Sequence, residues 1–409
     1  MRITKLFRNS VIILAGTLCL WPTVTWSQVP SYVRPATRNT GGTRPPAEKE
    51  LIYVTVPGTL EGTWDSAGTG IVVLDVANNF GFVKRIPTWD VPASAFPMQV
   101  AGVTASVENQ MIYVAARGKL GAWDLKTEKM VWENAFDGSC CERPQMAPDS
   151  SFMYVGSDLK DFWYVVNPKN GELITTVRSP LSPNAHNLNL SHDGKTAFMS
   201  PNGKVMGIAD TTTNTLTKTI PFPDNVRVFV LNHDDSLIYS NQNNLLGFVI
   251  ADVKTGAILH KVEVTGFPFH EIWDVTPRPR IPHACPSHGI ALVNNETEVW
   301  CVDGINNYIH IFDNTQMPPK QIAGASIKTN GGAYWITIGL DGKLAYCSSG
   351  DVIDTKTHKI VGQMKDEYGR ILRSEKLLDM LFVGGKLTRV SNQFGNGSIA
   401  VVEPASTKK

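Results

Sequence analysis

The sequence lacks the features that define several large classes of protein. Its 409 residues carry 38 Lys and Arg against 37 Asp and Glu, which gives a formal net charge of +1, and no basic run stands out. A nucleic-acid binder concentrates positive charge on one surface, so that class of protein is excluded. After the N-terminal region, no stretch approaches the roughly 18 apolar residues that a membrane-spanning helix needs. We therefore expect no membrane span.

Motifs for nucleophiles and cofactors are missing as well. No serine lies in a G-x-S-x-G turn, and no glycine-rich loop precedes a helix to hold a phosphate or a dinucleotide. Covalent c-type heme needs two cysteines followed by a histidine, which occurs nowhere. The segment HACPSH at residues 283–288 lacks the paired second half of a zinc site. We predict no cofactor in this chain, with a divalent metal as the open alternative.

The N-terminus has the pattern of a secretory signal. Basic residues precede an apolar run from Val11 to Trp21, and residues 25–27 approximate a cleavage site. We expect residues 1–27 to be removed and the protein to be exported to the periplasm or an equivalent compartment. Residues 28–49 are rich in Pro, Thr, Arg and Gly, which predicts an extended arm that acts as a tether or a docking segment.

One pattern recurs seven times from residue 51 onward. Each copy has a short β-rich segment with an aromatic residue, and these are Tyr53, Tyr113, Tyr154, Phe198, Tyr239, Trp300 and Tyr346. Each also has a polar turn, which begins at Asp75, Asp124, Asn167, Asp210, Asp252, Asp313 and Asp354. Asp and Asn favour turns because their side chains hydrogen-bond to the nearby backbone. A period of about 40 to 60 residues with short strands is typical of a β-propeller.

We therefore predict an all-β fold, a seven-bladed propeller that spans residues 50–404 as one domain, with a tail at residues 405–409. A closed ring needs strands from both ends of the chain in one blade. We expect the segment GSIAVVEP, around Val401, to supply the C-terminal strand of the blade that holds Tyr53. The stretch Arg373–Ser398 fits the repeat least, and is predicted to form a second interaction surface or a long connection.

The recurring aspartate, the aromatic residue and the D-x-K-T-G/H turns resemble the YVTN type of propeller repeat over residues 51–404. Propellers of this type include surface-layer proteins, lactonases and heme-free subunits of periplasmic redox complexes. The exported N-terminus, the length and the arm look most similar to the beta subunit of hydrazine synthase from anammox bacteria. The resemblance implies a subunit of a hetero-oligomeric oxidoreductase whose partner subunits carry heme. The alternative is a stand-alone lactonase or lyase that uses the channel-mouth residues with a divalent metal.

Candidate site residues follow from aligning the copies. An acidic residue or Asn precedes the aromatic residue by five positions in six copies, and seven positions further upstream stand Ala101, Glu142, His186, Arg227, His288 and Tyr334. In a propeller this level faces the central channel, so their side chains should converge on one rim. The candidate catalytic residues are Glu142, His186 and His288, and the candidate binding residues there are Arg143, Arg227, Tyr334 and Trp335. A wet polar rim without any function is the alternative.

Two cysteines, Cys140 and Cys141, are adjacent and stand directly before Glu142 at the predicted lip of the channel. A disulfide between them, another structural role, and a soft metal held together with His186 are the three alternatives. Cys301 and Cys347 each follow the aromatic residue in neighbouring copies, and we predict that they are buried free thiols.

The longest interruption of the repeat is Thr265–Gly289, between the fifth and sixth blades. It carries His270 and His283, which are further candidate binding residues, together with Trp273. Insertions on one face of a propeller commonly form a lid or a docking surface. We expect this insertion to contact the heme-carrying partner.

Overall fold

The computed structural model describes residues 48–57, 68–89, 100–157, 159–179, 184–267, 285–328 and 334–394. The chain divides into two units, residues 1–45 and 46–409, and every described strand belongs to the second unit. The described residues form strands and turns without a helix. No helix long and apolar enough to cross a membrane occurs among them.

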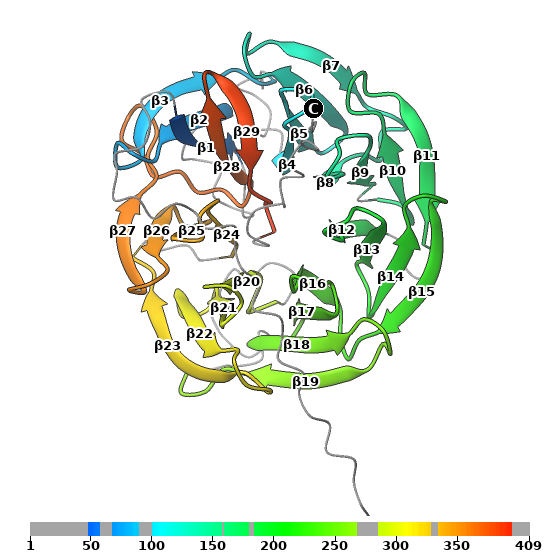
Figure 1. Cartoon of the computed structure of the whole chain (residues 1–409), viewed down its shortest axis with the longest axis vertical. Coiled ribbons are helices and arrows are strands. Elements are labelled where there is room, and N and C mark those ends of the chain that lie inside the picture. Colours follow the sequence, from blue (N-terminus) through cyan, green and yellow to red (C-terminus); the bar gives the residue numbers. More distant parts are fainter. Residues whose placement is uncertain are drawn as a thin grey trace, which may run out of the picture. The chain divides into compact units, whose positions relative to one another are not determined.

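Seven antiparallel sheets form a ring of blades around a central axis (Figure 1). Six of them are four-stranded and use consecutive strands, so each blade is a simple meander. The six blades consist of β4 (Val100–Ser106), β5 (Met111–Ala116), β6 (Lys119–Asp124) and β7 (Met130–Asn134); β8 (Glu142–Met146), β9 (Met153–Gly156), β10 (Phe162–Val166) and β11 (Leu173–Arg178); β12 (Ala185–Leu190), β13 (Thr196–Pro201), β14 (Val205–Asp210) and β15 (Thr215–Pro221); β16 (Val226–Leu231), β17 (Leu237–Gln242), β18 (Gly247–Asp252) and β19 (Ile258–Glu263); β20 (Ile290–Val293), β21 (Glu298–Asp303), β22 (Tyr308–Asp313) and β23 (Lys320–Ser326); β24 (Ile336–Ile338), β25 (Leu344–Cys347), β26 (Asp351–Asp354) and β27 (Lys359–Gln363).

The seventh sheet closes the ring with strands from both ends of the described chain. Its order is β29-β28-β1-β2-β3, made of β1 (Glu48–Val56), β2 (Gly70–Asp75), β3 (Gly81–Ile86), β28 (Leu377–Val383) and β29 (Lys386–Val390). Because β1 pairs with β2 on one edge and with β28 on the other, the C-terminal neighbour of Tyr53 is Leu378. The prediction that the segment around Val401 fills this place is wrong, and that segment lies outside the described residues. The closing strands come from the stretch that fits the repeat least.

The marks that predicted the repeat have clear structural roles. The seven aromatic residues are buried, each at 2% exposure or less. The Asp or Asn that begins each of the seven turns accepts a hydrogen bond from the backbone N–H two or three positions further on. Asp124 Oδ1, for example, accepts one from Thr127 at 2.6 Å. These local bonds set the hairpins between the third and fourth strands, and the aromatic residues fill the spaces between neighbouring blades.

Four of the inner strands are irregular near their first residue. One extra residue interrupts the pairing of β4 after Val100, of β8 after Glu142, of β12 after Ala185 and of β16 after Val226. A β-bulge of this kind turns a side chain away from its regular direction. The bulges therefore lie at the level of the aligned candidate residues, at the entrance to the central channel.

Candidate functional site

The structure brings most of the aligned residues together at one end of the central channel. Glu142, His186 and Arg227 lie at the starts of β8, β12 and β16, while His288 and Tyr334 lie two positions before β20 and β24. The inner strands surround the axis (Figure 1), and all run in the same direction because each follows an outer strand of the preceding blade. All five side chains are buried. Ala101, on β4, is also buried but offers no polar group.

Glu142 and His186 form the central pair of this site. The Nδ1 atom of His186 hydrogen-bonds to Oε2 of Glu142. Burial by itself would raise the pKa of Glu142, but His186, Arg143 and Lys376 together lower that pKa well below its usual range. Burial lowers the pKa of His186, and the adjacent Glu142 offsets this only in part. The carboxyl and imidazole groups therefore form one buried, hydrogen-bonded pair.

Arg143 occupies the bulge of β8 in a backbone conformation that side chains rarely adopt. Its φ is +42°, in the left-handed region. A Cβ added to Gly102 on the neighbouring β4 would lie 2.6 Å from the Cα of Arg143, so only glycine permits this close approach. The guanidinium carbon lies 4.4 Å from the centre of the Trp335 ring. Strained backbone of this kind clusters at functional sites and persists because the surroundings hold it.

Glu375 and Lys376 complete the charged groups, and the sequence did not identify either of them. They directly precede β28, which is the inner-strand neighbour of β1 in the closing blade. Lys376 Nζ lies 2.9 Å from Oε2 of Glu375 and 4.6 Å from the centre of the Trp335 ring. Burial and the nearby Arg143 lower the pKa of Lys376 to about 8. Their position directly before an inner strand could have identified them. The sequence analysis missed it because it assigned the closing strand to the segment around Val401 and not to β28.

Aromatic and neutral polar side chains surround these charges. The ring of His288 lies 5.9 Å from that of Trp335 and 6.2 Å from that of Tyr334. Arg227 donates hydrogen bonds to Asn243 at 2.6 Å and to Asn202 at 2.7 Å. We call the whole group the channel-end cluster, and it comprises Glu142, Arg143, His186, Arg227, His288, Tyr334, Trp335, Glu375 and Lys376.

The chain after β29 enters the channel beside this cluster, where Figure 1 shows it running from β29 toward the centre of the ring. The side chain of Gln393 accepts a hydrogen bond from Val103 N at 3.1 Å and donates one to Pro144 O at 3.3 Å. Its carbonyl accepts from Trp335 Nε1, and Phe394 packs against the Trp335 ring. Since these contacts reach three blades, residues 391–394 fill part of the channel.

The adjacent cysteines are joined by a disulfide, and both are buried among hydrophobic residues. At 3% and 0% exposure, Cys140 and Cys141 present no surface at the predicted lip of the channel. Cys285, Cys301 and Cys347 are buried free thiols, as predicted for the latter two. Burial raises the pKa of Cys285 above its usual range, so its sulfur is a protonated thiol that donates to Ser287 O.

The insertion is described only at its two ends. Phe267 packs against the rings of Tyr308 and His310. His270, Trp273 and His283 lie outside the described residues, so their roles stay predictions. Within the described ranges, no group of three His, Cys, Asp or Glu side chains could hold a metal ion.

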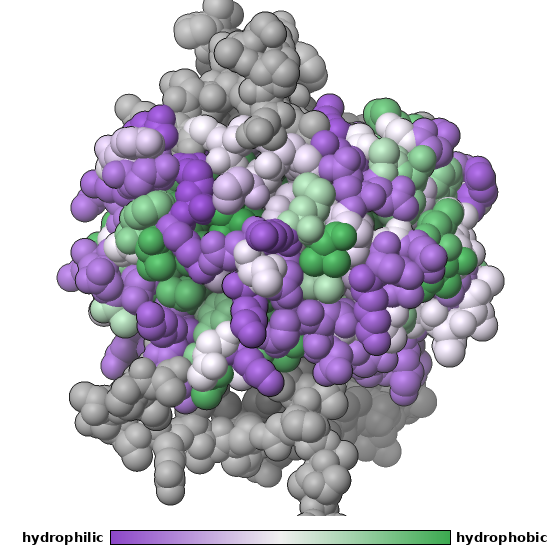
Figure 2. Space-filling model, turned by 90° about the horizontal axis from the view of Figure 1, so that it is seen from above, coloured by the Kyte–Doolittle hydropathy of each residue, from purple (hydrophilic) through white to green (hydrophobic). Residues whose placement is uncertain are grey.

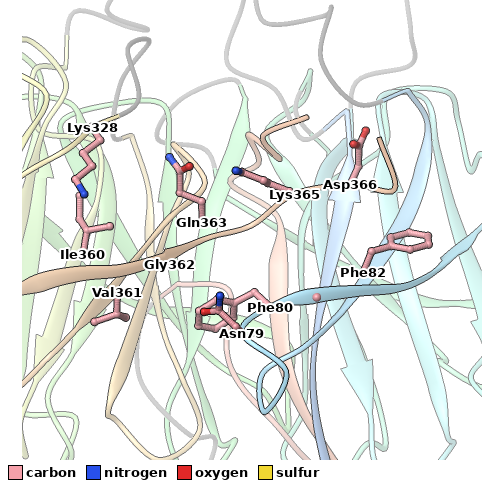
Figure 3. Close-up of a pocket in the computed structure, with 11 residues that line it drawn as sticks. Asn79, Phe80, Phe82, Lys328, Ile360, Val361, Gly362, Gln363, Lys365 and Asp366 are labelled. Carbon is pink, nitrogen blue, oxygen red and sulfur yellow. The ribbon is translucent and has the colours of Figure 1, made fainter. Parts of the chain in front are cut away.

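A second feature lies on the outer edge of the ring, between the closing blade and the last one. A groove of about 500 Å³ separates the outermost strands β3 and β27 (Figure 3), and we call it the edge groove. Its lining is mixed, with apolar, glycine and polar residues, namely Asn79, Phe80, Gly81, Phe82, Lys328, Ile360, Val361, Gly362, Gln363, Lys365 and Asp366.

Comparisons with known proteins define the fold and nothing finer. No protein-family model matches the chain, and no curated protein sequence matches it. Among solved structures, a chain of a "Crystal Structure of Mitotic Checkpoint Complex" superposes with a TM-score of 0.56 at 12% sequence identity. The match covers 75% of this chain and 91% of that chain. The protein is thus a seven-bladed β-propeller, a fold that hosts many unrelated functions.

Proposed function

We propose that this chain is a propeller subunit, without a cofactor of its own, of an exported oxidoreductase complex of the hydrazine synthase type. Partner subunits carry the heme, and this chain supplies a docking face. The edge groove carries the proposal, because it exposes apolar side chains of a kind that a protein working alone usually buries. The secretory pattern of the N-terminus supports export of the protein. The resemblance to heme-free propeller subunits supports the type of complex.

The chemistry of the edge groove fits an extended, acidic segment of a partner chain. Phe82 on β3 is 40% exposed and Val361 on β27 is 48% exposed. Both strands are outermost in their sheets, so each presents a free edge to which an extended peptide can pair. Lys328 and Lys365 are exposed beside the apolar residues (Figure 3), and they favour a partner segment with negative charge.

Other outer strands expose apolar residues too, but no groove of the described residues is lined by them on two facing strands. Other exposed apolar residues occur on outer strands, such as Leu173 and Ile174 on β11. On the side that Figure 2 draws, hydrophobic patches are small and separated by hydrophilic surface. These isolated residues are normal for a protein surface, whereas a groove with apolar walls on two facing strands points to a partner.

The alternative, a stand-alone lactonase with a divalent metal, has less support. Calcium needs six to eight oxygen ligands, and the channel-end cluster offers two carboxylates beside three cationic side chains. One of those carboxylates, Glu142, already contacts His186 and Arg143. A catalytic cation would have to displace these contacts inside a buried site.

The test is to purify the native protein untagged and to examine it by size-exclusion chromatography with detection of heme absorption. We expect the chain to elute together with a heme-carrying chain, through an interface of at least about 1,000 Å² in total. Phe82→Glu should abolish this co-elution because it places a charge in the groove. Leu173→Glu is the matched control, because Leu173 on β11 is an apolar residue of similar exposure (48%), and it should leave co-elution intact.

Two results would contradict the proposal. One is a native protein that elutes alone, with unchanged behaviour in the Phe82→Glu variant. The other is turnover of a lactone by the isolated chain, lost on Glu142→Gln, which would establish the enzyme alternative.

A further inference from the structure

Two carboxyl groups are buried where the ring closes. Asp379 lies on β28 and Glu50 on β1, at 0% and 5% exposure. In the register of these strands Asp379 is opposite Ile52 and Glu50 is opposite Leu381, so both side chains project from the same face of the closing blade. They are diagonal neighbours across two paired strands, a placement that lets long side chains reach each other.

This face of the closing blade packs against the last blade, which consists of β24–β27. Asp379 Oδ2 accepts a hydrogen bond from Leu340 N at 2.9 Å, in the turn between β24 and β25. A Cβ added to Gly339 in the same turn would lie 3.0 Å from that oxygen, so the turn approaches the carboxyl group closely. The carboxyl of Asp379 thus lies where β1, β28 and the last blade meet.

The surroundings of Asp379 do not suit a negative charge. Its Oδ1 atom is buried, and no N–H or O–H group of the described residues donates to it. Arg389 on β29 lies on the same face, but its Nη2 donates to Leu340 O at 3.1 Å. Within the described part of the chain, no cationic side chain forms an ion pair with Asp379. A carboxylate in such a place is strongly disfavoured.

A proton on Asp379 removes this conflict. Two ionised carboxylates can only accept hydrogen bonds, whereas a protonated carboxyl has an O–H that its neighbour accepts. Burial is the main cause that raises the pKa of Asp379 well above its usual range, and the charge of Glu50 and a hydrogen bond with it add to the effect.

The other polar and titratable groups around Asp379 do not reverse this. The hydrogen bond from Leu340 N favours the ionised form, but Asp341 in the same turn raises the pKa of Asp379 further. The ring of Tyr346 on β25 lies beside Gly339 and brings no positive charge.

We propose that Asp379 and Glu50 hold one proton between them, and that this proton fastens the closing blade and makes closure of the ring sensitive to pH. With the proton in place, the pair is joined by a hydrogen bond across β1 and β28. When the proton is lost, two negative charges lie close together in apolar surroundings, and their repulsion acts on the contact that closes the ring. The inference is independent of the proposed complex.

The direction of the pH effect follows from comparing the folded and unfolded chains. Folded Asp379 keeps its proton at pH values at which the unfolded chain has already lost it. The stabilisation is therefore complete below about pH 4, and it is lost as the pH rises toward the folded-state pKa of Asp379. Asp379→Asn is a neutral variant of nearly the same shape and has no such proton to lose.

Urea denaturation of the full chain and of Asp379→Asn at several pH values from about 4 to 8 tests the proposal. The unfolding equilibrium constant of the wild type, relative to the variant, should rise about tenfold per pH unit until the pKa of folded Asp379 is reached, and at least about tenfold in total. Parallel pH curves for the two proteins overturn the proposal.

Asp193→Asn is the matched control, because it makes the same substitution at an exposed aspartate in the turn between β12 and β13. Hydrogen bonds from Lys195 N and Ser191 lower the pKa of Asp193, so this carboxylate is ionised in the folded and the unfolded chain above about pH 5. The wild type should not lose stability relative to Asp193→Asn as the pH rises. An equal loss relative to both variants refutes the assignment to Asp379.

Hydrogen exchange then locates the effect. At pH 8, the backbone amides of β1 and β28 should exchange faster in the wild type than in Asp379→Asn, while those of β12 and β13 should exchange alike in the two proteins. An equal acceleration in all four strands, or none, overturns the assignment to the closing blade.

If Asp379→Asn does not fold, Glu50→Gln takes its place. This variant removes the second carboxyl group, so its own loss of stability between pH 4 and 8 should be smaller than that of the wild type. An equal loss refutes the shared proton.

Discussion

The channel-end cluster and the edge groove depart from ordinary burial in opposite directions. At the channel end, five charged side chains are buried, whereas at the groove aromatic and aliphatic side chains stay exposed. Buried charge and exposed apolar surface both lower the stability of an isolated chain. The seven repeats need neither feature to form blades. The comparison therefore separates two regions that the repeat alone does not explain, buried charge at the channel end and exposed apolar surface at the edge groove.

The strongest test of this comparison removes the carboxylate at the centre of the cluster. Glu142→Gln leaves Arg143 and Lys376 with one buried carboxylate between them, so we expect a loss of about 3–5 kcal/mol in the free energy of unfolding. Urea denaturation measures it. Asp161→Asn, which breaks the exposed pair with Arg178, is the control and should cost less than about 1 kcal/mol. Equal losses in the two variants would show that the cluster is no more sensitive than the surface.

The second test uses pH. Lys376 has a folded-state pKa of about 8 against an ordinary value of 10.5, so between these values the unfolded chain holds the proton more tightly. The free energy of unfolding of the wild type should therefore rise with pH over this window, by about 3 kcal/mol relative to Lys376→Met. This gain should be lost as the pH falls through 8.

The measurement is the free energy of unfolding of both proteins at several pH values from about 7 to 11. Lys195→Met is the control, because it makes the same substitution at an exposed lysine. A constant difference between the wild type and Lys376→Met would mean that Lys376 is solvated.

The smallest effect is expected in the edge groove. Phe82→Ser should change the free energy of unfolding by no more than about 0.5 kcal/mol, since the side chain is exposed in the folded chain. Phe80→Ser, two positions away in the same groove, should cost about 3–5 kcal/mol because Phe80 is buried against Gly362. Thermal unfolding of the two variants measures both changes in stability. A large loss in Phe82→Ser would make the groove part of the core.

Local chemistry explains what the sequence could predict. The Asp and Asn residues of the turns form hydrogen bonds within three residues, so each hairpin can be predicted from a single copy of the repeat. The recurrence of the aromatic residue predicts the spacing of the blades. Because Glu142, His186 and His288 stand at a constant distance from a turn, alignment alone placed them at one end of the channel. Their chemical role stays a prediction.

Other parts of the site depend on contacts between distant segments. Arg143 reaches its position through a bulge, which adds one residue without any mark in the sequence. Glu375, Lys376 and Gln393 belong to the closing stretch, which lacks the aromatic and turn marks of the repeat. Their positions follow from pairing of β28 with β1, a contact between residues more than 300 positions apart. The error about Val401 has the same origin.

The pairing of β1 with β28 also imposes an order of events on each newly made molecule. The ribosome completes β1 early, and that strand has one unpaired edge until Leu377–Val383 has been synthesised. The residues that then close the ring arrive directly behind Glu375 and Lys376 and ahead of Gln393. Any chain that ends before this segment lacks both a closed ring and a complete cluster, so closure and a finished site appear together in the same molecule.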